Sequence, residues 1–308
     1  MFVAFIAAVF LSAAPKPTTY LDKTAKEWAA ELEKGTGNAE EQLAIIARFK
    51  SEAAPYAPVV VRYLKVSKLS GEAAKALAAM GPAGLSVLEK AVLDPQVPLS
   101  DVLSALDTFE GAVDRALPQL GQRLDAIAGD EDLTDVLQVI DSHKLPAALL
   151  KWGRSSALRT LKLMRLIRTM QDAAVDDALA EFIASTDIAV AEGAVGAFKT
   201  RLGRGLSPKR AISLLEDKNE KVRARVVEVL TSSMQSIDHR EWLAARAKAE
   251  NDSSAEVRLA LATFSECRDD TLTITFCRDT DPRVRKAASD CRRMSGEPGC
   301  DNTKQPGK

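Results

Sequence analysis

One helical phrase recurs through the C-terminal half of this chain, and it constrains the fold more than any other feature. Each copy has an acidic or polar turn, then a valine that is followed by arginine in the clear copies, then a run of small and apolar residues. The clear copies lie at 217–230, 252–264 and 281–291, and a weaker copy lies at 187–198. The copies are separated by 32, 35 and 27 residues, measured between Val190, Val222, Val257 and Val284. A helical repeat of this length predicts a solenoid of stacked helices.

The residue types within each copy explain why the phrase repeats. In the last copy, small or apolar residues recur at helical spacing on one face: Val284, Ala287, Ala288, Cys291 and Met294. Such a face lets neighbouring helices approach closely. The aspartate that opens each clear copy suits a helix start, where free backbone N–H groups and the positive end of the helix dipole lie.

The arginine after each valine can reach a carboxylate of the adjacent copy. We call the resulting set the arginine ladder: Asp217, Arg223, Asp252, Arg258, Asp281 and Arg285. This interpretation gives the six residues a structural role. The alternative is that the three arginines form a basic row that binds a partner.

Helical patterns also fill the rest of the chain, with short breaks between them. Beyond the repeats, helices are expected at 22–34, 38–49, 58–64, 72–80, 82–93, 98–110, 112–128, 131–142, 146–152, 155–170, 172–185 and 188–202. Residues 271–276 alternate like a strand, but the repeat requires a helix there, so we predict a short helix. The sequence therefore predicts an all-α fold over residues 22–295, followed by a loose tail at 296–308.

The N-terminus has the pattern of an export signal. Residues 2–14 form an uncharged apolar run that is too short to span a bilayer but fits the apolar region of a signal peptide. We therefore predict a signal peptide at 1–14 and a linker at 15–21. No Lys or Arg precedes the run, so an uncleaved anchor and a misassigned start codon remain alternatives. The expected location is extracytoplasmic, either periplasmic or secreted, with no membrane span after signal removal.

All four cysteines lie near the C-terminus: Cys267, Cys277, Cys291 and Cys300. An even number of cysteines in an exported chain suggests disulfides. Cys267 and Cys291 end successive Val-Arg helices and should lie on one side, whereas Cys277 ends the antiparallel helix between them, where the tail could bring Cys300. This favours Cys267–Cys291 with Cys277–Cys300. The sequential pairing, Cys267–Cys277 with Cys291–Cys300, and reduced buried thiols remain open.

Charge is segregated in blocks along the chain. Residues 94–141 carry 11 acidic and 2 basic residues, 143–171 carry 7 basic residues and no acid, and 172–192 carry 6 acidic residues and no base. In a solenoid such blocks lie side by side and could neutralise one another. The alternative is a surface for an acidic partner, formed by Arg159, Lys162, Arg165 and Arg168. Their three-residue spacing turns them by about 60° per step, so they form a spiral on the helix.

The repeated phrase resembles the HEAT repeats of the short bacterial kind. The segments that carry the resemblance are 217–230, 252–264 and 281–291, together with residues 73–88, which resemble a HEAT helix pair with the pattern Ala-Leu-x-x-Met-Gly-Pro. The resemblance implies a right-handed, armadillo-like α-solenoid of stacked antiparallel helix pairs. It also implies a surface of successive equivalent helices that binds other proteins.

The sequence offers little support for catalysis. It has no Gly-rich phosphate loop, no Gly-x-Ser-x-Gly and no His-Glu-x-x-His, and its net charge is −1. We predict no catalytic residues, metal, cofactor or nucleic-acid partner. The expected function is an exported, non-catalytic scaffold or adaptor that binds protein partners. The alternatives are an enzyme or chromophore-binding protein resembling phycobilin lyases, and a structural component of the cell envelope.

Overall fold

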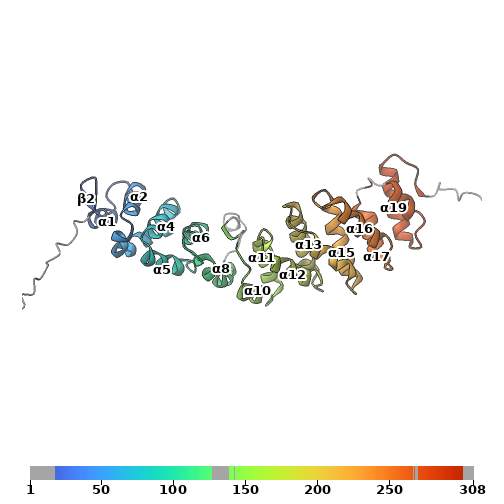
Figure 1. The fold of residues 1–308 in the computed structure, drawn as a ribbon, viewed down its shortest axis with the longest axis horizontal. Coiled ribbons are helices and arrows are strands. Elements are labelled where there is room, and N and C mark those ends of the chain that lie inside the picture. The colour runs from blue at the N-terminus through green and yellow to red at the C-terminus, as the bar shows by residue number, and fades with distance from the viewer. Residues whose placement is uncertain (1–17, 127–138, 142, 266, 268–269, 301–308) are drawn as a thin grey trace, which may run out of the picture. The chain divides into compact units, whose positions relative to one another are not determined.

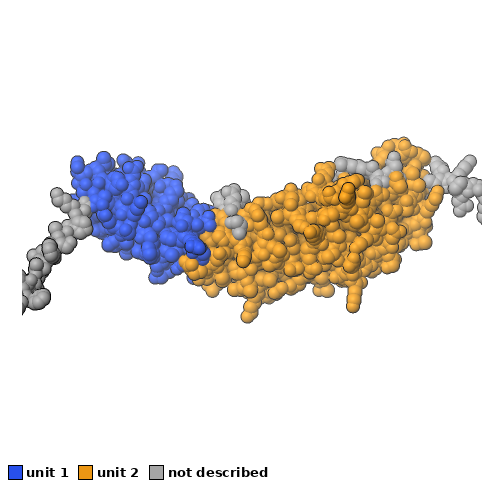
Figure 2. Space-filling model, viewed as in Figure 1, with its two compact units in different colours: residues 1–112 blue, residues 113–308 orange. Residues whose placement is uncertain are grey.

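The computed structural model describes residues 18–126, 139–141, 143–265, 267 and 270–300. Helices make up most of these residues and there is almost no sheet among them, which confirms the predicted all-α class (Figure 1). Contacts between Cα atoms divide the chain into two compact units, residues 1–112 and 113–308 (Figure 2), although the sequence suggests one continuous repeat region. No helix in the described part of the chain combines the length and the apolar character needed to cross a membrane.

Unit 1 begins with a small hairpin, the one sheet among the described residues. Its strands are β1 (Thr19–Tyr20) and β2 (Lys23–Thr24). The indole N–H of Trp28 donates to the carbonyl of Tyr20 over 3.0 Å, and the Tyr20 ring packs edge-on against Phe49. The C-terminal part of the expected linker is therefore packed against the first helices of unit 1. The predicted signal peptide lies outside the described residues.

Short helices build the rest of unit 1. They are α1 (Ala25–Lys34), α2 (Ala39–Arg48), the 3₁₀ helix η1 (Lys50–Tyr56), α3 (Ala57–Val60), the 3₁₀ helix η2 (Val61–Lys65), α4 (Ser70–Ala79), α5 (Pro82–Ala91) and α6 (Leu99–Leu106). The helix expected at 58–64 is divided between α3 and η2. Pro55 lies inside η1, and Pro58 lies in the first turn of α3, where its missing backbone N–H is tolerated.

Alternate helices of unit 1 pack against one another. Helix α4 contacts α2 on one side and α6 on the other, while α5 contacts both α4 and α6. Gly84 on α5 makes this packing possible, because a Cβ built there would lie 1.7 Å from the carbonyl oxygen of Leu77 on α4. The preceding corner is made by Gly81 at φ 71° and by Pro82 in the first turn of α5.

The described part of unit 2 consists mostly of helices. They are α7 (Ala112–Ala116, which starts at the unit boundary), η3 (Leu117–Gln119), α8 (Leu120–Ala126), α10 (Ala147–Gly153), α11 (Ala157–Ile167), α12 (Ala173–Ile183), α13 (Ile188–Gly203), α14 (Lys209–Ser213), η4 (Leu214–Glu216), α15 (Glu220–Ser232), η5 (Met234–Ser236), α16 (His239–Glu250), α17 (Ala255–Phe264), α18 (Asp270–Phe276) and α19 (Pro282–Met294). Helix α18 confirms the helix predicted at 271–276. Most of the helix predicted at 131–142 lies outside the described residues.

The odd-numbered helices of unit 2 from α11 to α19 each contact the next one in the series. Each also packs against the even-numbered helix that precedes it in the chain, from α10 with α11 to α18 with α19. Figure 1 shows these helices following one another through the unit. The valines that open the clear copies, Val222, Val257 and Val284, are fully buried in this packing.

The face predicted for the last copy is only partly buried. Ala288 and Cys291 on α19 are buried with Val284, as their helical spacing predicts. Met294, which we expected on the same face, is 76% exposed because it lies in the last turn of α19, beyond that buried part of the helix. The buried face of α19 thus ends near Cys291.

Two disulfides join the last helices and the start of the tail. They link Cys267 to Cys291 and Cys277 to Cys300, with Cα–Cα distances of 5.0 and 5.1 Å. This is the pairing that the expected helix directions favour, rather than the sequential one. Two disulfides in one chain indicate an oxidising, extracytoplasmic compartment. The disulfide at Cys300 holds residues 296–300, expected as loose tail, and the rest of that tail lies outside the described residues.

Candidate functional site

The arginine ladder is present between α15 and α17. The Nε and Nη2 groups of Arg223 donate to the two carboxylate oxygens of Asp252 over 2.7 and 2.8 Å. Its Nη1 group donates to the carbonyl of Asp217 over 2.8 Å. The two side chains of the pair are 13% and 11% exposed. A planar guanidinium therefore joins the turn before its own helix to the turn before the next odd-numbered helix.

The next rung has the same geometry, with a different acceptor from the one we predicted. Arg258 on α17 donates to the carboxylate of Asp279 over 2.7 and 3.0 Å, and its Nη1 group donates to the carbonyl of Asp252 over 2.7 Å. Asp281, the predicted acceptor, binds Arg283 instead. The ladder therefore continues through Asp279.

Asp279 rather than Asp281 binds Arg258 because the ladder aspartate lies two residues before the residue that caps the helix. In each turn the ladder aspartate accepts the backbone N–H two residues later, and that later residue caps the helix. The pairs are Asp217 with Asn219, Asp252 with Ser254, and Asp279 with Asp281, each at 2.8 Å. Our expectation that the opening aspartate caps the helix thus holds for Asp281 and is wrong for Asp217 and Asp252. The repeated motif is Asp-x-cap-x-x-Val-Arg.

The weaker copy lacks the ladder arginine and uses another one. Ala191 stands at the arginine position of α13, and Ser185 stands at the aspartate position, where its hydroxyl accepts the N–H of Asp187. Arg225 on α15 donates to the carbonyls of Ile183 and Ser185 over 2.6 and 3.2 Å. A guanidinium from the following copy therefore binds the Ser185 carbonyl, which corresponds to the carbonyls of Asp217 and Asp252 that the ladder arginines bind.

Electrostatics keep the ladder carboxylates ionised. The hydrogen bonds from Arg258 lower the pKa of Asp279 and outweigh its burial. Burial acts to raise the pKa of Asp252, but hydrogen bonds from Arg223 and from the Ser254 backbone more than offset it, so this pKa is also lowered. Each rung is thus an ion pair at neutral pH.

The four cations predicted to bind an acidic partner lie on α11 and its C-terminus, where they are not one free patch. Arg159 donates to both carboxylate oxygens of Asp125 over 3.0 and 2.8 Å, which lowers the pKa of that carboxyl. Lys162 donates to the carbonyl of Leu124 over 2.8 Å. Arg165 and Arg168 are exposed. Two members of the set thus bind the chain's own helix α8, so the acidic block before α11 is partly neutralised by this basic block.

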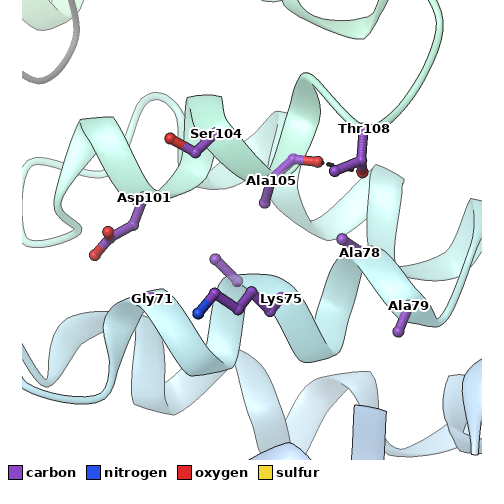
Figure 3. Close-up of a pocket in the computed structure, with 9 residues that line it drawn as sticks. Gly71, Lys75, Ala78, Ala79, Asp101, Ser104, Ala105 and Thr108 are labelled. Atoms are coloured by element: carbon purple, nitrogen blue, oxygen red, sulfur yellow. Dashed lines mark hydrogen bonds between the residues drawn. The ribbon is translucent and has the colours of Figure 1, made fainter. Parts of the chain in front are cut away.

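A groove between α4 and α6 is a feature that the sequence analysis did not identify. It has a volume of about 540 Å³, and its walls are mostly small apolar side chains, including Ala74, Ala78 and Ala105. Figure 3 shows Lys75 and Asp101 facing this space from opposite helices. The alanines recur on α4 with helical spacing, but such spacing equally predicts buried packing, so the sequence gives no separate signal for a groove.

Lys75 supplies the positive charge beside this groove. Its ammonium group lies 2.6 Å from Glu72, and its side chain is 71% exposed. Hydrogen bonding to Glu72, with a smaller contribution from the charge of Asp101, raises the pKa of Lys75. The groove therefore combines an apolar floor with the exposed Lys75–Glu72 ion pair on one helix and a carboxylate on the opposite helix. Among the described residues, no group of three or more His, Cys, Asp or Glu could hold a metal ion.

Comparisons with known proteins provide no family. No protein-family model matches the chain, and no curated protein matches it. Among solved structures, it is similar to the crystal structure of an engineered protein from a structural genomics consortium. The two are 15% identical over 89% of this chain and 95% of the other, with a TM-score of 0.31. A score of this size supports no argument about function.

Proposed function

We propose that this chain is an exported, non-catalytic scaffold that binds protein partners through HEAT-like repeats arranged as a right-handed α-solenoid. The observation that carries the proposal is the arginine ladder. It joins α15 to α17 and α17 to α19 through the same guanidinium contacts. Repeated joints of this kind create a series of equivalent helices whose exposed faces serve as a binding surface. The disulfides support the extracytoplasmic location.

The groove between α4 and α6 is the binding site that we assign to this scaffold. A partner helix with an apolar stripe fits a groove that lies between two helices and has alanines on its walls, because small side chains permit close approach. Lys75 and Asp101 would orient that helix by pairing with a carboxylate and a cation beside its stripe. The occupant we propose is therefore an amphipathic helix of another extracytoplasmic protein.

Site-specific photocross-linking in the cells that naturally produce the protein tests this function. A photoreactive benzoylphenylalanine at Ser104 lines the groove, and the same group at Lys90 on the exposed side of α5 is the matched control. We expect a discrete adduct with another protein from position 104 and none from position 90. Adding Ala78→Leu to the Ser104 probe variant should remove the adduct, because leucine fills part of the groove.

Two outcomes would contradict the proposal. A folded, exported variant that gives no adduct at position 104 would show that the groove has no protein occupant. An adduct that contains only a second copy of the chain would favour the structural envelope component instead. Circular dichroism of each variant establishes that the helices are intact before either conclusion is drawn.

A further inference from the structure

A second cavity lies at the C-terminal end of unit 2, far along the sequence from the groove. It has a volume of about 320 Å³ and lies against α19 and the Cys277–Cys300 disulfide. Three cations line it, Arg285, Lys286 and Arg293, against one carboxylate, Asp290. That carboxylate lies 2.9 Å from Lys286 and 3.6 Å from Arg293. The cavity therefore has an excess of positive charge.

Arg285 is the last arginine of the ladder, and its guanidinium is held as in the two rungs before it. Its Nη1 group donates to the carbonyls of Asp279 and Thr280 over 2.7 and 2.9 Å. Arg223 makes the equivalent pair of bonds with Nη1 over 2.8 and 3.3 Å, and Arg258 does so over 2.7 and 3.3 Å. The backbone of the preceding turn thus fixes the orientation of all three guanidinium groups.

The three arginines differ at the other edge of the guanidinium. In Arg223 and Arg258 the Nε and Nη2 groups bind the aspartate of the next turn. Within the described part of the chain, no carboxylate contacts those two groups of Arg285. An oriented guanidinium edge with two parallel donors matches a carboxylate, and orientation by the backbone reduces the entropy lost on binding.

We propose that Arg285 binds an aspartate or glutamate carboxylate from an acidic turn of a partner protein, which takes the place that Asp252 and Asp279 occupy in the earlier rungs. Lys286 and Arg293 add positive charge around the bound carboxylate. The inference rests on the proposed protein-binding function and specifies the chemistry of one partner segment. It concerns a different surface from the α4–α6 groove, so each can fail without the other.

Nuclear magnetic resonance of the arginine Nε–Hε groups tests this site in the full, oxidised chain. The probe is a blocked peptide with the sequence of residues 251–257, which contains the ladder aspartate Asp252, and the control peptide carries Asp252→Asn. We expect the Arg285 signal to shift saturably with the acidic peptide and the control peptide to bind at least about tenfold more weakly. The Arg258 signal should not move, because Asp279 already occupies its donors.

Two variants keep this test decisive. Arg285→Lys retains the charge but not the paired donors, so it should lose most of the peptide binding, whereas Arg283→Lys on the same helix should retain it. Equal shifts at Arg285 and Arg258, or no shift at Arg285 in the folded chain, would overturn the proposal. A change in the Arg285 signal caused by Asp301→Asn alone would also overturn it, because the chain's own aspartate would then be the occupant.

Discussion

The two units connect alternate helices in different ways. In unit 2, α15, α17 and α19 are joined by ion pairs whose side chains are mostly buried, with Arg223 on Asp252 and Arg258 on Asp279. In unit 1, α4 and α6 meet through small apolar residues and leave a groove. The comparison shows that packing between alternate helices can be determined by oriented ion pairs or by close contact of small side chains. The ion pairs fix how each helix is positioned against the next, whereas the small side chains leave a surface that a partner can occupy.

Removal of one ladder carboxylate should have the largest effect on stability. Asp252→Ala leaves Arg223 without its partner in a site where both side chains are mostly buried, so we expect the free energy of unfolding of unit 2 to fall by about 3–5 kcal/mol. Urea unfolding followed by circular dichroism measures it. The control is Glu256→Ala, which breaks an exposed pair with Arg283 and should cost less than about 1 kcal/mol. Equal losses of unfolding free energy in both variants would show that the ladder pair stabilises unit 2 no more than an exposed ion pair does.

Loss of the terminal disulfide should have the next largest effect. The Cys277→Ser/Cys300→Ser variant frees a link between residues 23 positions apart, so we expect unit 2 to lose about 3 kcal/mol. Differential scanning calorimetry should show this loss in the transition of unit 2 and leave unit 1 unchanged. If both transitions shifted together, the two units would unfold as one and the contrast between them would not hold energetically.

Adding one methyl group at Gly84 should disrupt the close packing of α4 against α5 in unit 1. Gly84→Ala places a Cβ against the Leu77 carbonyl, which requires α4 and α5 to separate, and we expect a loss of about 1–3 kcal/mol. The matched control is Gly196→Ala on α13, where the Cβ meets open space and should stabilise the helix by up to about 1 kcal/mol. Opposite signs in thermal unfolding would support this account of unit 1, and a neutral Gly84→Ala would contradict it.

Acid should weaken the ladder by a smaller amount. Asp252 and Asp279 have pKa values that are lower in the folded chain than in the unfolded one. Their contribution is therefore complete above the unfolded value of about 4 and is lost as pH falls through the lower folded values. We expect the stability difference between the parent chain and Arg258→Gln to narrow between pH 5 and pH 2, measured by urea unfolding. A difference that is constant with pH would contradict the ion-pair interpretation.

Much of the fold could be predicted because its signals are local. Helical spacing identified the buried valines, and helix direction favoured the disulfides that link Cys267 to Cys291 and Cys277 to Cys300. The register of the ladder could not be predicted, since Asp279 and Asp281 are both suitable acceptors in sequence and only the turn geometry separates their roles. The guanidinium edge of Arg285 that no described carboxylate contacts was also missed, as was the α4–α6 groove, because each depends on which neighbouring groups the fold brings alongside.

A double-mutant cycle on Arg258 and Asp279 tests the ladder most directly. The free energies of unfolding of the parent chain, Arg258→Met, Asp279→Leu and the double variant give the coupling between the two side chains. We expect a coupling of about 1.5–3 kcal/mol, as for a hydrogen-bonded charge pair that is largely buried. A coupling below about 0.5 kcal/mol would mean that the guanidinium contacts do not join successive helices, and would remove the main support for a repeated scaffold.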